Sequence, residues 1–250
     1  SRFGYKNGIL GLSGGIDSTV SAFLSARALG PEHVIALLMP YGEAFQRDTE
    51  DARIVAEALG IRTELIDISP SVDAYYSRYA TDNRVLKGNK MARERMSLLY
   101  DFSEREKALI IGTSNKTELL LGYGTLHGDM ACAINPLGDL YKTQVRALGR
   151  HLGVPDRILN KAPTAGLWDG QTDEQELGLP YPEIDEILYH MIDKRISKQG
   201  LLDKGFEETK VDRLIRMIRG SEFKRRMPPI AKISERTVGH DFLYPYDRDK

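Results

Sequence analysis

Residues 8–30 read GILGLSGGIDSTVSAFLSARALG, and this stretch decides the fold. It opens with a short apolar run bounded by glycines, residues 8–12, which predicts a buried strand. Apolar residues then follow helical spacing at Val20, Phe23 and Leu24, and Gly30 is a natural helix end. A strand, a turn rich in glycine and hydroxyl groups, and a helix N-terminus together present backbone N–H groups to an anion. The stretch therefore predicts a phosphate-binding turn in an α/β fold.

This turn differs from the two commonest phosphate-binding loops. A Walker A loop needs a lysine before its Ser or Thr, which residues 11–18 lack, and the dinucleotide fingerprint G-x-G-x-x-G is also absent. The remaining pattern, S-G-G-x-D-S after a strand, resembles the pyrophosphate-binding loop of the ATP pyrophosphatases, which cleave ATP to AMP and pyrophosphate. That resemblance implies that Asp17 holds Mg²⁺ and that Ser13, Ser18 and the loop amides contact phosphate oxygens. The alternative is an ordinary glycine-rich turn whose helix is capped by Asp17 or Ser18.

Composition narrows the class of protein. The 250 residues fit one large domain, and 35 basic against 36 acidic residues leave a formal charge of −1. Because the net charge is close to zero, no overall electrostatic attraction draws the chain to nucleic acid or a membrane, and it is expected to bind neither. No apolar stretch approaches the roughly 18 residues of a membrane span. The one cysteine, Cys132, excludes an internal disulfide and a cysteine-based metal site. This cysteine usage and the lack of a visible signal peptide favour a cytoplasmic location.

The following segments repeat the order of strand and helix. Residues 33–40 predict a second buried strand, residues 48–59 a helix, residues 62–68 a third strand and residues 108–112 a fourth. This order implies right-handed crossovers and a parallel sheet with helices on both faces. Ligands bind at the carboxyl ends of such strands, which would bring Met39 near an adenine; the alternative is a core methionine at a strand end.

A second polar turn, residues 113–118, follows the fourth predicted strand and should open on the same sheet edge as the first. Glu118 in this turn would offer Mg²⁺ a second carboxylate beside Asp17. Lys142 precedes a predicted helix over residues 143–152, where a cation is disfavoured by the helix dipole. An anion held at that helix start would resolve the conflict.

The remaining segments predict packing rather than chemistry when taken alone. Residues 88–100 predict a helix, and a solvated basic face would explain its Lys90, Arg93 and Arg95. Residues 161–171 predict a long loop, and the apolar spacing between residues 184 and 218 predicts amphipathic helices.

Taken together, these blocks resemble the NAD synthetase family, the amidating members of the ATP pyrophosphatases, from about residue 8 to about residue 230. The resemblance rests on blocks that follow one another in the family's order. They are LSGGIDS at 12–18, GN with ARERM at 88–96, GTSNKTE at 112–118, GD at 128–129, NPL at 135–137, KAPTA at 161–165 and KRRMPP at 224–229.

The resemblance implies a fold and a reaction. The fold would be an α/β, adenine nucleotide alpha-hydrolase-like parallel sheet with C-terminal helices. It would form a single domain, with a nucleotide-binding core at 1–160, a lid-like loop at 161–180 and a helical part at 181–250. The enzyme would be a homodimeric ligase that forms a C–N bond. ATP adenylates the nicotinate carboxylate of deamido-NAD, pyrophosphate leaves, and ammonia displaces AMP to give NAD. Glutamine-dependent relatives carry an extra domain with a catalytic cysteine, for which this chain has no room, so the expected nitrogen donor is ammonia, either free or released by a separate glutaminase.

The resemblance also implies the site residues. Asp17 and Glu118 would hold Mg²⁺, Asp129 would bind ammonium and deliver ammonia, and Lys142 would stabilise the departing pyrophosphate. The residues that would contact ATP are Gly11, Leu12, Ser13, Gly14, Gly15, Ile16, Asp17, Ser18, Met39, Thr113, Lys142 and Thr164. Those that would contact deamido-NAD are Arg93, Phe223 and Lys224.

The chain departs from the family pattern at three positions. Many relatives have Lys where Leu126 stands and Asp where Ala133 stands, both in contact with deamido-NAD, and many have Asp at Gly166. The contacts to the nicotinate half of the substrate are the ones these departures affect.

Three rival interpretations remain open. A tRNA-thiolating enzyme with the same loop would need catalytic cysteines and a basic surface, which one cysteine and a charge of −1 disfavour. A GMP synthetase core would accept a purine nucleotide in place of deamido-NAD. A nucleotide-binding module without catalysis would not need Asp17 and Glu118 both poised for a metal.

Overall fold

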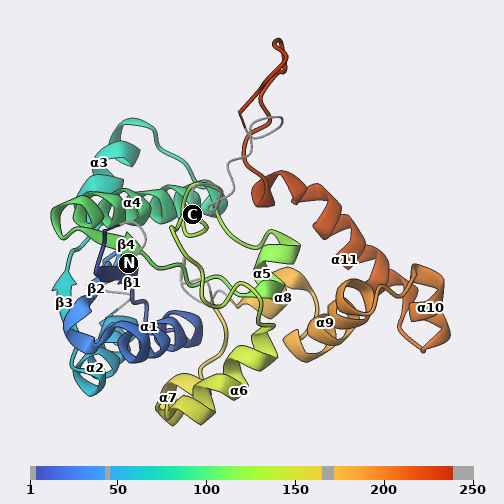
Figure 1. Ribbon diagram of the computed structural model, residues 1–250, viewed down its shortest axis with the longest axis horizontal. Coiled ribbons are helices and arrows are strands. Elements are labelled where there is room, and N and C mark those ends of the chain that lie inside the picture. Colours follow the sequence, from blue (N-terminus) through green and yellow to red (C-terminus); the bar gives the residue numbers. More distant parts are fainter. Residues whose placement is uncertain (1–3, 43–45, 165–171, 239–250) are drawn as a thin grey trace, which may run out of the picture.

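A computed structural model describes residues 4–42, 46–164 and 172–238 of the chain. At its centre is a four-stranded parallel sheet with the strand order β3-β2-β1-β4 (Figure 1). Its strands are β1 (Asn7–Gly11), β2 (Val34–Leu38), β3 (Arg62–Leu65) and β4 (Ala108–Ile110). All three strand pairings are parallel, so the predicted α/β class with a parallel sheet is confirmed.

The central strands supply two apolar layers because successive side chains of a strand point to opposite faces. One layer joins Leu10, Ala36 and Leu38 to residues of α1 (Ile16–Leu29), α2 (Gln46–Leu59) and α6 (Lys142–Leu152). The other joins Ile9 and Leu37 to residues of α3 (Ser69–Arg78) and α4 (Arg84–Arg105). Figure 1 shows α3 and α4 on one side of the sheet and α1 and α2 on the other. Helices therefore cover both faces, as predicted.

The predicted helices of the C-terminal part pack around a core of their own. They are α9 (Tyr181–Leu188), α10 (Lys198–Asp203) and α11 (Glu208–Gly220), and they lie beside α5 (Lys116–Leu121) (Figure 1). The buried side chains of this cluster include Ile184, Ile187, Leu201, Val211 and Leu214. Short elements complete the fold: η1 (Pro31–His33), α7 (Asp156–Leu159), α8 (Asp173–Leu177), η3 (Tyr189–Asp193) and η4 (Glu222–Arg225).

Several boundaries differ from the prediction. Helix α4 begins at Arg84, four residues before the expected start, because the side chain of Asn83 accepts a hydrogen bond from the Leu86 amide and caps the helix there. Strand β3 ends at Leu65, although the amide of Ile66 still bonds to the carbonyl of Leu38, the last residue of β2, and that of Ile68 to the carbonyl of Pro40. Helix α8 lies inside the segment 161–180 that was expected to be a loop.

A buried hydrogen-bond network ties α5, α6 and α9 together. The Thr117 hydroxyl donates to Asp185 at 2.5 Å and accepts from the Lys142 amide at 3.1 Å. The other Asp185 oxygen accepts from the Thr143 amide at 2.8 Å. Because Thr117 lies on α5 and bonds to the amide of the first residue of α6, this network fixes where α6 begins relative to α5.

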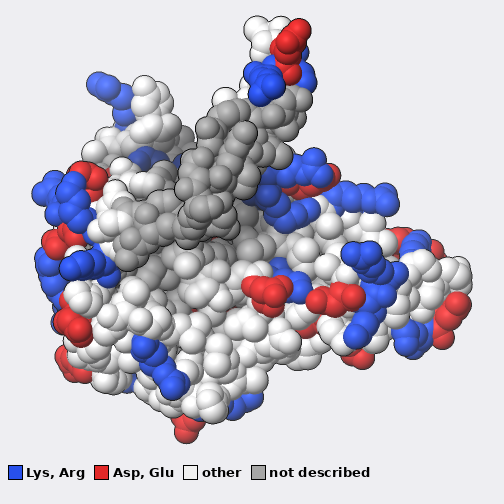
Figure 2. Space-filling view, in the orientation of Figure 1, with Lys and Arg blue, Asp and Glu red and all other residues white. Residues whose placement is uncertain are grey.

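On the face shown in Figure 2, acidic and basic side chains are both spread over the surface, and a group of basic side chains lies near the upper end of α11. None of the helices in the described ranges is long and apolar enough to cross a membrane.

Candidate active site

A cavity of about 480 Å³ opens at the carboxyl edge of the sheet. Gly11 and Leu12 reach it from β1, Met39 from β2, and Ile111 and Gly112 from β4. Strands β2 and β4 lie on opposite sides of β1, so the chain leaves β1 toward one side and later returns on the other. That is the switch point at which open parallel sheets bind ligands.

Most of the predicted site residues line this cavity. They are Gly11, Leu12, Ser13, Gly15, Ile16, Asp17, Ser18, Met39, Thr113, Glu118, Asp129, Lys142, Thr164 and Lys224. Three predicted residues do not: Gly14, Arg93 and Phe223. The Arg93 side chain is exposed and donates to the Leu126 carbonyl at 3.2 Å, and Phe223 is 60% exposed. Contact of Arg93 and Phe223 with a substrate therefore stays a prediction. Gly166 lies outside the described residues.

The turn before α1 is held by its own hydroxyl groups. The Ser13 amide donates to the Ser18 hydroxyl at 3.2 Å, and the two serine hydroxyls lie 3.0 Å apart. Gly14 takes a φ of 75°, where a side chain would be strained, and a Cβ there would lie 2.3 Å from the Asp48 carbonyl oxygen.

Helix α1 begins without a side-chain cap. Its N-cap is Gly15, and no side chain accepts from its first turn as a cap. The side-chain cap by Asp17 or Ser18 that the ordinary-turn alternative expected is therefore wrong, while phosphate binding by the turn stays a prediction. The uncapped amides of this 14-residue helix and its dipole favour an anion in the cavity.

Lys142 joins the two carboxylates that were predicted to hold a metal. Its Nζ lies 2.5 Å from Asp17 and 3.2 Å from Glu118, and the lysine side chain is buried. Burial alone would lower the pKa of Lys142, but the charges of Asp17 and Glu118 outweigh it and raise that pKa, so the lysine is charged. Burial raises the pKa of Glu118, against the attraction of Lys142. The anions expected at the start of α6 are thus the two carboxylates, which offset the unfavourable helix dipole.

The same two carboxylates fit a magnesium ion. Both converge on the point that Lys142 Nζ contacts, and both line the cavity. Mg²⁺ prefers one or two protein carboxylates and completes its coordination with phosphate oxygens and water. In the described part of the chain, no group of three or more His, Cys, Asp or Glu side chains forms a metal site, so a site here would have these two protein ligands.

Asn115 positions both carboxylates. As the N-cap of α5, its Oδ1 accepts from the Glu118 amide at 3.0 Å, and its own backbone amide donates to the Glu118 carboxylate at 3.3 Å. Its Nδ2 donates to Asp17 at 2.8 Å. The capping box therefore holds Glu118 at the helix start and orients Asp17 from the neighbouring turn.

Asp129 and Lys224 occupy another side of the cavity. One Asp129 oxygen accepts from the Thr125 amide at 2.8 Å, and burial raises the pKa of this carboxyl. Lys224 Nζ donates to the carbonyls of Gly122 and Gly124, at 2.7 Å each. Burial lowers the pKa of Lys224, against the attraction of Asp129. A carboxylate that lines the cavity, beside a lysine that holds its loop, forms a polar site at which a small cation can bind.

Several cavity residues had no assigned role in the sequence. Lys161 bonds to the Gly14 carbonyl at 3.3 Å and pairs with Asp48 and Asp51 at 2.6 and 2.8 Å, so it braces the back of the turn. Asp173 accepts from the hydroxyls of Tyr123 and Tyr181. The T-D-E run at 172–174, a helix-start signal, could have revealed Asp173 as part of an ordered element.

Comparison with known proteins gives consistent matches. The family model described as NAD synthase matches residues 1–228. An NH3-dependent NAD+ synthetase of Trichlorobacter lovleyi is 51% identical over 249 residues, covering 100% of this chain and 91% of that enzyme. An NH3-dependent NAD synthetase structure from Campylobacter jejuni has a TM-score of 0.78 and 37% identity, and an NMN synthetase structure from Francisella tularensis has 0.80 and 36%. Each structural match covers 92% of this chain and 91% of the other.

Proposed function

Because the chain belongs to the NAD synthase family, we propose that its cavity is the active site in which deamido-NAD is amidated with ammonia. Formation of NAD from deamido-NAD and ammonia is the reaction of the family, and the fold is its adenine nucleotide alpha-hydrolase-like fold. The observation that carries the proposal for this site is the contact of Lys142 with Asp17 and Glu118 beside the uncapped start of α1.

The chemistry requires two anions to meet. A carboxylate becomes an electrophile only when its oxygen is part of a good leaving group, and ATP provides one by transferring AMP to it with loss of pyrophosphate. The start of α1 and the turn at 11–18 bind the triphosphate, and Lys142 stabilises charge on the departing pyrophosphate. Most of this catalysis is positioning and charge neutralisation.

Asp17 and Glu118 would hold Mg²⁺ in the loaded enzyme. When bound, the ion would neutralise phosphate charge and help to orient the triphosphate. In its absence Lys142 supplies the cation that these carboxylates share, and Asn115 keeps both oriented.

Asp129 is the proposed ammonium site. Its carboxylate lines the cavity and attracts the ammonium cation, and a carboxyl with a raised pKa is suited to taking the proton that ammonium loses before attack. Ammonia then adds to the acyl carbon, and AMP leaves with the carboxylate oxygen that it acquired.

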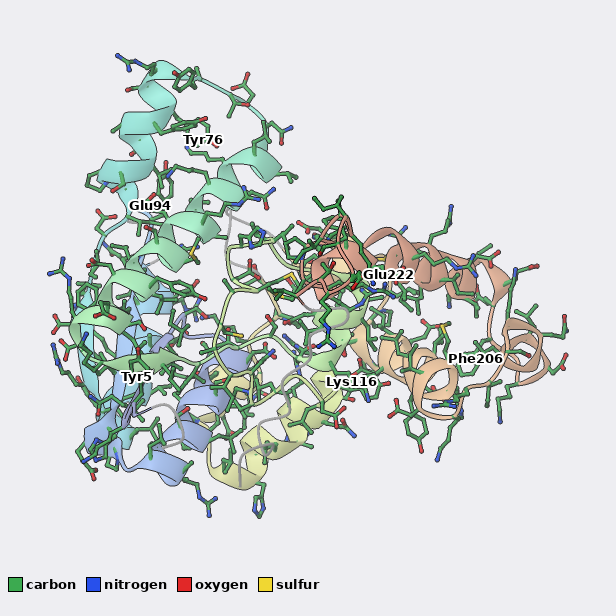
Figure 3. All side chains as sticks on the ribbon, turned by 45° about the horizontal axis from the view of Figure 1, so that its top comes forward. Tyr5, Tyr76, Glu94, Lys116, Phe206 and Glu222 are labelled. Atoms are coloured by element: carbon green, nitrogen blue, oxygen red, sulfur yellow. The ribbon has the colours of Figure 1, made fainter. Side chains whose placement is uncertain are left out.

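Removal of either metal-binding carboxylate tests this assignment. We expect Asp17→Asn and Glu118→Gln each to abolish Mg²⁺-dependent pyrophosphate release from ATP and deamido-NAD, while circular dichroism shows a folded protein. Lys116→Met is the matched control, because Lys116 begins the same helix α5 (labelled in Figure 3) but pairs with Asp139 and Asp193 and does not line the cavity. Full activity in either acid variant would remove that residue from the mechanism.

A second substrate is favoured by one structural match. The similar structure from Francisella tularensis is an NMN synthetase, and Leu126 and Ala133 replace residues that contact deamido-NAD in many relatives. The alternative substrate is therefore deamido-NMN, which carries the same nicotinate carboxylate on a mononucleotide. Comparison of kcat/KM for the two substrates decides between them, and a higher value for deamido-NMN would make the mononucleotide the main substrate.

We also propose that the chain forms a homodimer, as the family resemblance implies. Tyr75, Tyr79, Val85 and Leu86, on α3 and the start of α4, are large apolar side chains exposed in the monomer, and they support the proposal. Sedimentation at micromolar concentration should give twice the 28.1 kDa of one chain, and a single-chain mass would refute it.

A further inference from the structure

Arg95 is a cavity residue that none of the roles above uses. It lies on α4, next to Glu94 (labelled in Figure 3), and its side chain lines the cavity rather than a solvated face. Its Nε donates to the Met39 carbonyl at 3.0 Å, which fixes one edge of the guanidinium at the carboxyl end of β2. The solvated basic face expected for this helix is therefore wrong for Arg95.

The charge of Arg95 lacks a local counterion. Four cations among the described residues line the cavity, and Lys142 and Lys161 both contact carboxylates. Lys224 uses two of its N–H groups on backbone carbonyls. Across residues 4–42, 46–164 and 172–238, no carboxylate lies within ion-pair distance of Arg95 and only one of its five N–H groups has a partner.

The guanidinium of Arg95 is half-buried, and its partial desolvation without a counterion costs free energy. Desolvation lowers the pKa of Arg95 to about 10, and the more distant charge of Asp129 offsets this only in part. The side chain is still charged at neutral pH. This cost is offset when an oxyanion enters the cavity and accepts hydrogen bonds from the unpaired N–H groups of the guanidinium. The planar arrangement of these groups matches the oxygens of a carboxylate or a phosphoryl group.

We propose that Arg95 binds an oxyanion at the point where the two substrates react: the nicotinate carboxylate of deamido-NAD or the α-phosphate of ATP. Two features of its position carry this inference. It is anchored on Met39, at the end of β2 where the adenine of ATP is expected, and its charge interacts with Asp129, the proposed ammonium site. The carboxylate and the α-phosphate must meet between those two places, and a cation there reduces their mutual repulsion. The inference rests on the proposed function.

Binding measurements with two Arg95 variants test the proposal without requiring turnover. Arg95→Met removes both the charge and the paired N–H donors of the guanidinium, whereas Arg95→Lys keeps the charge alone. Calorimetry would compare three ligands: deamido-NAD, NAD, and an ATP analogue that cannot transfer AMP. NAD is the informative control because its amide replaces the carboxylate and leaves the rest of the dinucleotide unchanged. Lys90→Met is the matched protein control, since Lys90 pairs with Glu94 on the same helix and does not line the cavity.

We expect Arg95→Met to weaken one anionic ligand about 10- to 100-fold, the loss of a charge-assisted hydrogen bond, and Arg95→Lys to lie between it and wild type. A loss for deamido-NAD that spares NAD identifies the carboxylate, and a loss for the ATP analogue identifies the phosphate. The melting temperature of ligand-free Arg95→Met should not fall, because a desolvated charge has been removed.

Two results would overturn the proposal. One is affinities within twofold of wild type for all three ligands. The other is an equal loss for deamido-NAD, NAD and the ATP analogue with a lower melting temperature, which would mean that Arg95 only supports the end of β2. Wild-type turnover of deamido-NAD tests the proposed function separately, so failure of one idea is distinguishable from failure of the other.

Discussion

Single residues in this cavity carry charges whose cost the fold does not fully offset. Lys142 is neutralised by Asp17 and Glu118, whereas Asp129 has only a backbone amide and a more distant lysine to offset its charge. A carboxylate so placed favours the protonated form in the folded protein. The charged form of Asp129 therefore lowers stability at pH values above the ordinary pKa of aspartate, because its pKa is raised in the folded protein.

Asp129→Asn should separate stability from activity. The folded-state pKa of Asp129 is raised, so the wild type loses stability as the pH rises from the unfolded-state pKa through the folded-state pKa. The neutral variant does not lose stability in this way. The difference in unfolding free energy between Asp129→Asn and wild type should therefore favour the variant more at pH 7 than at pH 4. NAD formation should nevertheless fall by about 100-fold or more, since the ammonium site is lost.

Urea denaturation at the two pH values checks the first expectation, and NAD assays check the second. Asp82→Asn is the control, because Asp82 is exposed and its substitution should show neither effect. An Asp129→Asn variant with wild-type activity would contradict the proposed ammonium site.

At the scale of elements, the capping box of α5 links helix stability to the site. Asn115→Ala removes the acceptor for the Glu118 amide and the donor to Asp17. We expect a loss of about 1 kcal/mol in unfolding free energy, typical of a lost N-cap, together with a lower kcat because both carboxylates lose their orientation.

Asn83→Ala supplies the matched comparison. Asn83 caps α4 through the Leu86 amide at 3.1 Å, is exposed and does not line the cavity. It should lose similar stability and retain its kcat. Equal kcat losses in the two variants would show that helix fraying, rather than carboxylate orientation, limits the reaction.

Across the whole molecule, the Thr117–Asp185 network joins the sheet-bearing part to the C-terminal helices. Thr117→Val keeps the volume of a fully buried side chain but leaves a carboxylate oxygen and the Lys142 amide without this partner. Unfolding free energy should fall by about 2 kcal/mol or more. Urea denaturation checks this against Thr63→Val, an exposed strand position where little change is expected. A similar loss at both positions would remove the special role of the network.

Much of this architecture could be predicted because the spacing of apolar residues and the turn residues within a short stretch determine its strand, turn or helix. The apolar run at 8–12, the turn and the helical spacing after it specify β1, the phosphate-binding turn and α1 without any long-range information. The carboxyl-edge rule then brings Asp17 and Glu118 together, although 101 positions separate them in sequence.

What could not be predicted depends on contacts distant in sequence. The start of α4 follows from Asn83, whose capping role its own pattern did not single out. Arg95 and Lys90 look alike in a helical pattern, yet one lines the cavity and the other pairs with Glu94. Lys161 braces the phosphate-binding turn from 147 residues away. The division into a core at 1–160, a lid-like loop at 161–180 and a helical part at 181–250 stays a prediction.

One measurement tests the central claim most directly: pyrophosphate, AMP and NAD formed from ATP, Mg²⁺ and deamido-NAD, with ammonium, with glutamine and with neither. The account predicts equal yields of the three products with ammonium alone and no NAD with glutamine. Turnover of ATP with another carboxylate or a purine nucleotide, but not with deamido-NAD, would contradict the substrate while leaving the phosphate-binding turn in place.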